Sequence, residues 1–251
     1  MTEKKTSLAY KIVKWGLKVC YGNVASFGTE HLPEEPCIIA GNHCQLNGPI
    51  SCELFFPIPR YTWCAGEMHH MDELPDYCYR DFWSFKPKRS RWYYKLMSYP
   101  TAWLLHFLCK NANTIGVYRD ARVMGTFKKT VRTLADGYSV VIFPERNQLH
   151  NHIIYDFQDR FIDVARLYYK QTGKALAFTP MYIAPRLRQL HLGVPTYFRP
   201  DVPMDEERER IKTYLMESIT ALAEALPRHT VVPYRNIPRR LYPKNIPDEV
   251  T

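Results

Sequence analysis

The segment Tyr138-Ser-Val-Val-Ile-Phe143, closed by Pro144, decides the fold class. A short, continuous apolar run rich in β-branched residues and ended by a proline predicts a strand that is buried on both faces. Pro36-Cys-Ile-Ile-Ala-Gly41 has the same character. Strands covered on both sides belong to parallel sheets with helices on each face. The two segments therefore predict an α/β fold with a mostly parallel central sheet flanked by helices.

Helical and strand patterns alternate around these two runs. Phe127, Val131 and Leu134 recur at helical spacing, which predicts a helix between the two strands. Asp156 is suited to cap a later helix that ends near Gly173. The other predicted elements are helices over 49–56 and 205–226 and strands over 114–118 and 175–183. The aromatic-rich stretch 57–111 has no clear periodicity and predicts no element.

The composition limits the class of protein. The 251 residues carry a net charge of +9, with 5 Trp, 18 Tyr and 12 Phe. A basic chain favours phosphate, whether on nucleic acid, on a lipid or on a small substrate. The 7 cysteines are odd in number and contain no C-x-x-C pair, which argues against a disulfide framework and a zinc ribbon. We therefore expect a globular protein of a reducing cytosol.

The N-terminal stretch from Leu8 to Cys20 has an interfacial pattern. Lys11, Lys14 and Lys18 share one helical face, and Trp15 lies among the aliphatic residues that cover the rest. A basic stripe beside Trp and aliphatic residues predicts a helix lying in a lipid interface, although a domain helix with its lysines in water has the same pattern. No apolar run approaches membrane-spanning length. We divide the chain into an amphipathic membrane-docking helix (1–25), an α/β domain (26–227) and a basic, proline-rich extended tail (228–251).

Two predicted strand ends carry polar side chains, and ligands of parallel sheets bind at such ends. His43 follows the first strand, where a neutral imidazole can act as a general base. Glu145 and Arg146 follow the second strand and suit a polar substrate. Taken alone, each motif also describes a packed histidine or a solvated ion pair.

Together the motifs resemble the glycerolipid acyltransferases, typified by bacterial lysophosphatidate acyltransferases. Four blocks match in order over most of 36–185. These are Asn42-His43 with Pro49, Ile115-Gly116-Val117-Tyr118-Arg119, Val141-Ile142-Phe143-Pro144-Glu145, and Phe178-Thr179-Pro180-Met181-Tyr182. The first resembles the family's Asn-His-x-x-x-x-Asp, and the third its Phe-Pro-Glu-Gly-Thr-Arg.

The resemblance implies acyl transfer from acyl-CoA or an acyl carrier protein to the hydroxyl of a lysophospholipid acceptor. His43 would be the base, Arg119 would hold the acceptor phosphate, and Glu145 would order the site. We add Arg146 as a second phosphate ligand. The acyl thioester is a co-substrate, so no bound cofactor or metal is expected. Both substrates carry phosphate, which suits a basic protein resting on the cytoplasmic face of an anionic membrane without spanning it.

This chain departs from the family pattern beside the proposed base. Gly48 stands where the family has the aspartate that orients the histidine and stabilises its cation. Asn47 lies on nearly the same helical face as His43 and is the candidate orienter, but it is neutral. In the third block, Arg146-Asn147-Gln148 replaces Gly-Thr-Arg. A weakly active or inactive relative that binds membrane lipid is therefore an alternative.

Three other functions compete with acyl transfer. Cys44 suggests thiol catalysis, for which the thiol needs a basic neighbour. It directly follows His43, but adjacent residues rarely present their side chains to each other. Metal binding is conceivable at two groups with no standard zinc spacing, namely Cys64, His69, His70 and Cys78, or His150 and His152. Lysines and arginines mixed with aromatics over 86–95 suggest a nucleic-acid-binding module, but no recognised motif accompanies them, so no nucleic acid partner is expected.

Overall fold

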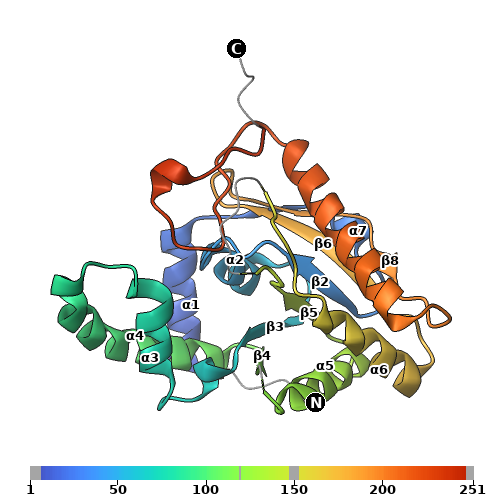
Figure 1. The fold of residues 1–251 in the computed structure, drawn as a ribbon, viewed down its shortest axis with the longest axis horizontal. Helices are drawn as coiled ribbons and strands as arrows, with labels where there is room; N and C mark the ends of the chain where they lie inside the picture. The colour runs from blue at the N-terminus through green and yellow to red at the C-terminus, as the bar shows by residue number, and fades with distance from the viewer. Residues whose placement is uncertain (1–6, 119, 147–152, 247–251) are drawn as a thin grey trace.

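The protein folds around one sheet in a computed structural model that describes residues 7–118, 120–146 and 153–246. The strands run in the order β1-β7-β6-β2-β5-β3-β4, and β8 pairs with β6 (Figure 1). The strands are β1 (Ala25–Phe27), β2 (Cys37–Gly41), β3 (Arg60–Ala65), β4 (Thr114–Val117), β5 (Ser139–Ile142), β6 (Ala177–Ala184), β7 (Gln189–Leu192) and β8 (Thr196–Tyr197).

The sheet is mostly parallel. The pairs β2–β5, β2–β6, β3–β5, β3–β4 and β1–β7 are parallel, and only β6–β7 and β6–β8 are antiparallel within the described chain. The helices are α1 (Leu8–Tyr21), α2 (Asn47–Phe55), α3 (Leu74–Cys78), α4 (Arg91–Asn111), α5 (Val123–Ala135), α6 (Asp163–Thr172) and α7 (Met204–Glu224). The predicted α/β fold with flanking helices is confirmed.

Alternation along β2 shows how the two faces of the sheet are covered. Ile38 and Ala40 pack into the core formed with α5, α6 and α7. Cys37 and Ile39 pack on the opposite side, where the core includes Cys52 of α2. All four side chains are almost completely buried. An apolar run without polar alternation is therefore what a central strand between two helical layers requires.

Helix α1 packs on α2 through a side that the sequence did not indicate. Tyr10 is buried and its hydroxyl donates to Glu53, which also accepts an ion pair from Lys14 at 2.6 Å. Lys18 lies over the ring of Phe55. The alternative of a domain helix whose lysines simply face water does not hold for Lys14, which is partly buried in that ion pair, whereas Lys18 is exposed. The apolar side chains of α1 are exposed instead: Leu8, Ile12, Trp15 and Val19.

Residues 153–159 are not helical, so the prediction that Asp156 caps a helix is wrong. Helix α6 begins at Asp163, after a 3-10 turn (Arg160–Ile162). Phe157 instead forms an isolated β-bridge with Glu145, and the amide of Arg146 donates to the Asp156 carbonyl. Backbone pairing with the distant third block overrides the local capping signal. Gly173 does end α6, in the left-handed conformation.

The stretch 57–111 contributes β3 and a helical lobe (Leu74–Asn111), which we call the α3–α4 lobe. It contains α3, a π-helical turn η3 (Tyr79–Trp83), a 3-10 turn η4 (Lys88–Ser90) and α4, and it has its own small core of Leu74, Cys78 and Ala102. Figure 1 shows the lobe at the left, beside α1. No helix in the described ranges is both long and apolar enough to cross a membrane.

Residues 229–245, which the sequence assigns to an extended tail, pack against the α/β domain. Val231 and Asn245 are buried, and the Asn245 side chain donates to the carbonyl of Ala223 at the end of α7. The amide of His229 in turn donates to Asn245. We call this segment the C-terminal strap; it is the red segment above α2 in Figure 1.

Candidate active site

The two candidate motifs meet at the carboxyl ends of β2 and β5. These strands are parallel neighbours in which Ala40 pairs with Ile142. His43 and Glu145 follow that pair at the same offset, so the register places them opposite each other. The amide N–H of His43 donates to Oε1 of Glu145 over 3.0 Å, between residues 102 apart in the sequence. The sheet register therefore builds one corner from two separate motifs.

The turn between β2 and α2 is strained and firmly held. Cys44 and Gln45 adopt left-handed φ angles of 49° and 57°, which cost a residue other than glycine about 1 kcal/mol or more. Asn42 anchors the turn to β6, because its side chain accepts from the amide of Ile183 (2.7 Å) and donates to the carbonyl of Ile183 (3.0 Å). These bonds maintain a backbone conformation that the local sequence disfavours.

This turn orients the imidazole. Nδ1 of His43 donates to the backbone carbonyl of Gln45 over 2.5 Å. A carbonyl oxygen only accepts, so the proton of a neutral ring lies on Nδ1 and the lone pair lies on Nε2. The Gln45 carbonyl thus fixes the tautomer that a general base needs.

Gly48, at the position of the family's aspartate, is required by the packing of the turn. Its amide donates to the carbonyl of His43 over 3.1 Å. A Cβ added at Gly48 would clash with that same oxygen and would lie 3.0 Å from Cε1 of Phe143. Backbone atoms cannot move aside as the end of a long side chain can, so this turn excludes an aspartate at residue 48.

Asn47 does not orient the imidazole, which corrects the role suggested by its helical position. Its Nδ2 donates to the carbonyl of Cys44 (2.9 Å), and its Oδ1 accepts from the hydroxyl of Tyr21 (3.0 Å). Asn47 begins α2 rather than lying one turn after His43 on a continuous helix, so the expected spacing does not apply. Its side chain ties α2 to α1.

Aromatic rings cover the imidazole. The ring of Tyr234, in the C-terminal strap, stacks on His43 with centroids 4.4 Å apart, and Phe143 lies at 5.2 Å. Removal from water disfavours the cation, and this burial lowers the pKa of His43 from its usual 6.5 to about 4. His43 is therefore neutral at pH 7 and able to accept a proton.

Glu145 is also uncharged near neutral pH. Its side chain is only 6% exposed, and burial raises its pKa to about 8, while the hydrogen bond from the His43 amide acts in the opposite direction. The carboxyl group and the imidazole are thus both neutral at pH 7, which reduces the cost of burying them together. Glu145 contacts the His43 backbone and thereby positions the turn.

The strap is attached at several points around this corner. Gln45 donates through Nε2 to the hydroxyl of Tyr242 over 2.8 Å. Asn236 donates to the carbonyl of Asp81 in the α3–α4 lobe. The buried His229 is hydrogen-bonded to the hydroxyl of Tyr182 on β6 at 2.8 Å. The strap therefore joins the turn, the sheet and the lobe.

The two predicted phosphate ligands differ in what the structure shows of them. Arg146 forms an ion pair with Asp156 at 2.6 Å, and Asp156 also pairs with Lys212 of α7 at 2.7 Å. The Arg146 side chain is 46% exposed, so part of it faces solvent. Arg119 lies outside the described residues, as do His150 and His152 of the second metal candidate.

The competing cysteine and metal sites have other surroundings. Cys44 is fully buried, and its thiol contacts Asn42 and the carbonyl of Ile183; burial raises its pKa well above the usual value. Cys64 lies 3.4 Å from Nε2 of His69, whereas His70 bonds to Tyr118. Among the described residues, no group of three or more His, Cys, Asp and Glu side chains is arranged to hold a metal ion.

Sequence reasoning missed two groups at the site. The Gln45 carbonyl is a backbone atom whose direction depends on two left-handed residues, so no side-chain pattern predicts it. Tyr234 lies far along the chain in a proline-rich segment, and only the return of the strap brings it to His43. Asn42 belongs to the recognised first block, but its bonds to β6 are visible only in the fold.

Comparisons with known proteins show a similarity of fold. No family model and no curated protein matches the sequence. Among solved structures, the chain is similar to the 1-acyl-sn-glycerophosphate (LPA) acyltransferase PlsC from Thermotoga maritima, with 13% identity and a TM-score of 0.51. The match covers 87% of this chain and 80% of that one. This chain therefore has an α/β fold similar to that of a glycerolipid acyltransferase.

Proposed function

We propose that the protein transfers an acyl chain from an acyl thioester, acyl-CoA or acyl carrier protein, to the hydroxyl of a lysophosphatidate-like glycerolipid. One observation carries the proposal. His43 is held at the corner shared with Glu145, with its Nδ1 proton bound to the Gln45 carbonyl and its ring neutral at pH 7. The fold similarity to PlsC favours acyl transfer among the reactions that a neutral histidine can catalyse as a base.

In this reaction, Nε2 of His43 takes the proton of the acceptor hydroxyl as its oxygen attacks the thioester carbonyl. The tetrahedral intermediate collapses with cleavage of the carbon–sulfur bond, and the leaving thiolate takes the proton back from the imidazolium. The ester and the free thiol are the products. No covalent enzyme intermediate is needed, because a thiolate leaves readily and positioning lowers the barrier.

The imidazolium formed during transfer is stabilised here by a carbonyl dipole instead of a carboxylate. Donation from Nδ1 to Gln45 keeps the ring in position, but a dipole stabilises the cation less than a full charge does. We therefore expect slower turnover than in enzymes that carry the aspartate. Arg119 and Arg146 are the proposed ligands of the acceptor phosphate, with Arg146 exchanging its contact to Asp156 for the phosphate.

The proposed location is the cytoplasmic face of an anionic membrane, without crossing it. Leu8, Ile12, Trp15 and Val19 form an exposed apolar stripe along α1, each at least 60% exposed. Trp and aliphatic side chains on one face of a helix are suited to the boundary between headgroups and acyl chains. Contact with a membrane accounts for this exposed stripe of α1 without a soluble ligand.

A weakly active or inactive lipid-binding relative is the second candidate function. The stacking of Tyr234 on His43 favours it, because that ring covers one face of the imidazole. A nucleic-acid-binding module is the less favoured third candidate, since its basic segment 86–95 carries no recognised binding motif.

The test is product analysis after incubation with acyl-CoA or acyl carrier protein and a panel of lysolipids. Acylated lipid and free thiol in equal amounts support the proposal, provided that His43→Ala abolishes both. Asn47→Ala is the matched control, because Asn47 neighbours the turn but does not contact the ring. Full transfer by His43→Ala refutes the assigned base, and lysolipid binding without any product favours the lipid-binding protein.

A further inference from the structure

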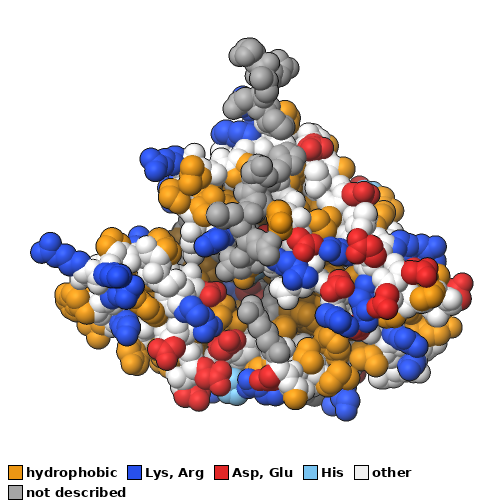
Figure 2. Space-filling view, viewed as in Figure 1, with side chains coloured by type: hydrophobic (Ala, Val, Ile, Leu, Met, Phe, Trp, Pro, Cys, Tyr) orange, Lys and Arg blue, Asp and Glu red, His pale blue; other side chains and the backbone are white. Residues whose placement is uncertain are grey.

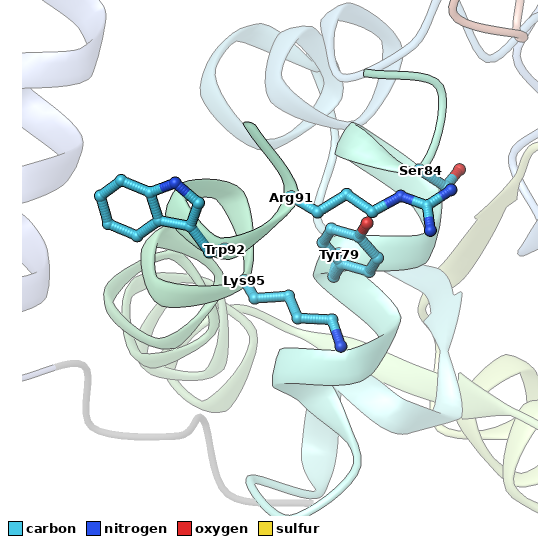
Figure 3. Close-up of a pocket in the computed structure, with 5 residues that line it drawn as sticks. All are labelled: Tyr79, Ser84, Arg91, Trp92 and Lys95. Carbon is cyan, nitrogen blue, oxygen red and sulfur yellow. The ribbon is translucent and has the colours of Figure 1, made fainter. Parts of the chain in front are cut away.

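The α3–α4 lobe contains an open pocket away from the sheet-edge site. It has a volume of about 500 Å³ and is lined by Tyr79, Ser84, Arg91, Trp92 and Lys95. Figure 3 shows Tyr79 between the side chains of Arg91 and Lys95, while the indole of Trp92 points the other way. Two cations and a tyrosine thus share one depression on the surface. Such a combination is suited to an anion with an organic substituent, because the cations attract the charge and the ring contacts the substituent.

The cations of this pocket have no acidic partner in the described part of the chain. Lys95 contacts the ring of Tyr79, with Nζ 5.7 Å from its centroid, and both Arg91 and Lys95 are exposed. The segment before α4 adds Lys86, Lys88 and Arg89, and one carboxylate, Asp81, lies in the η3 turn between Tyr79 and Ser84. An unpaired guanidinium and ammonium on neighbouring turns of one helix are able to bind the same phosphate.

An aromatic stripe adjoins the pocket along α4. Trp92, Leu96, Tyr99 and Trp103 recur at spacings of four, three and four, and each is more than 60% exposed. The residues of α4 that pack on the rest of the lobe, such as Ser98 and Ala102, lie on a different face. Figure 2 shows hydrophobic and basic side chains intermixed over this part of the surface. Trp and Tyr prefer the boundary between water and hydrocarbon.

We propose that this pocket binds the phosphate of an anionic phospholipid headgroup while the aromatic stripe of α4 lies in the membrane interface. Charge complementarity selects the occupant: cations without partners meet phosphate, and apolar rings beside them meet acyl chains. A free phosphate would leave the stripe exposed. The inference rests on the proposed function for the lipid nature of the partner, but it concerns binding away from His43 and does not depend on turnover.

The test is co-sedimentation of the full chain with phosphatidylcholine vesicles that contain or lack phosphatidic acid. Arg91→Gln with Lys95→Gln should weaken binding to the acidic vesicles about thirtyfold, because each basic residue at an anionic surface contributes about 1 kcal/mol. The matched control is Arg166→Gln with Lys170→Gln. These residues have the same charges and spacing on α6 and are also exposed, but they lie outside the lobe.

Three outcomes would overturn the proposal. The first is equal loss of binding in the two double variants, which indicates general attraction between charges. The second is equally tight binding of inorganic phosphate in the absence of vesicles, which indicates a soluble ligand. The third is a greater loss of single-stranded oligonucleotide binding than of vesicle binding, which indicates a nucleic-acid site. Circular dichroism confirms that each variant is folded.

One further variant separates this proposal from the proposed function. His43→Ala should sediment with acidic vesicles as the unchanged protein does, even though acyl transfer is lost. If the unchanged protein does not bind acidic vesicles but still transfers an acyl chain to a soluble short-chain lysolipid, the lobe proposal is wrong and the proposed function stands. If the unchanged protein binds these vesicles but transfers no acyl chain from any thioester, the lobe proposal stands and the proposed function is wrong.

Discussion

At the edge of the sheet, burial removes charge, whereas the α3–α4 lobe keeps its charges in water. Glu145 is buried and His43 is partly buried among the sheet, the strap and aromatic rings, and both are neutral at pH 7. Arg91 and Lys95 lie open beside exposed tryptophans. The difference shows that the core fixes a few side chains for chemistry, while an exposed helical lobe presents many side chains for contact.

Replacement of the proposed base should have the largest effect. We expect His43→Ala to lower kcat/KM about 10²- to 10⁴-fold, the usual contribution of a positioned general base. The thermal midpoint and the circular dichroism spectrum report whether the fold is retained. A variant that is folded and retains full activity would remove His43 from the mechanism.

Restoring the family's aspartate should harm this protein. Gly48→Asp forces a Cβ against the carbonyl of His43, so we expect a loss of about 1–3 kcal/mol in the free energy of unfolding and lower activity. Urea titration and initial rates measure the two effects. Gly48→Ala is the control, because it adds the Cβ without the charge. An increase in activity with Gly48→Asp alone would show that the Gln45 carbonyl is a poor substitute for a carboxylate.

The pH dependence of activity reports the burial of His43. The base is neutral above its pKa, so kcat/KM should fall only as the pH drops through about 4, and not through the usual 6.5. Tyr234→Ala removes a ring that excludes water, and the acidic limb should then move upward toward 6.5. Phe85→Ala, a change at an exposed ring of the lobe, should leave the limb in place.

Glu145 should make stability fall with rising pH. Its pKa is raised in the folded protein, so between about pH 4.5 and 8 the folded state holds a proton that the unfolded state releases. The stabilisation is therefore present below pH 4.5 and is lost as the pH rises through 8. In Glu145→Gln this contribution should disappear, which urea titrations at pH 5 and pH 8 can measure. An unchanged pH dependence would mean that the carboxyl group is ionised in the folded protein.

The lobe surface should contribute least to stability. Trp103 is 64% exposed, and we expect Trp103→Ala to change the free energy of unfolding by less than about 0.5 kcal/mol. Thermal unfolding measures this directly. A large loss of stability would show that the aromatic stripe is part of the folded core.

Sequence patterns predicted those parts of the fold in which burial imposes a simple rule. β2 and β5 were found because strands covered on both faces are continuously apolar, and helices such as α5 because one face repeats at helical spacing. The lobe was not predicted, since its aromatics cover both its small core and its surface and so obscure the period. Asp156 was misassigned because a long-range bridge outweighed its capping preference.

The sequence alone predicts a mostly parallel sheet, the two strand ends that carry His43 and Glu145, and the basic, aromatic character of the chain. These features follow from side-chain chemistry and local spacing. The folded structure is needed to see that a backbone carbonyl orients the imidazole, that the turn has no space for a Cβ at Gly48, and that Tyr234 covers the ring. Those contacts depend on a strained turn and on the return of a distant segment, because backbone direction and long-range packing leave no periodic trace in the order of residues.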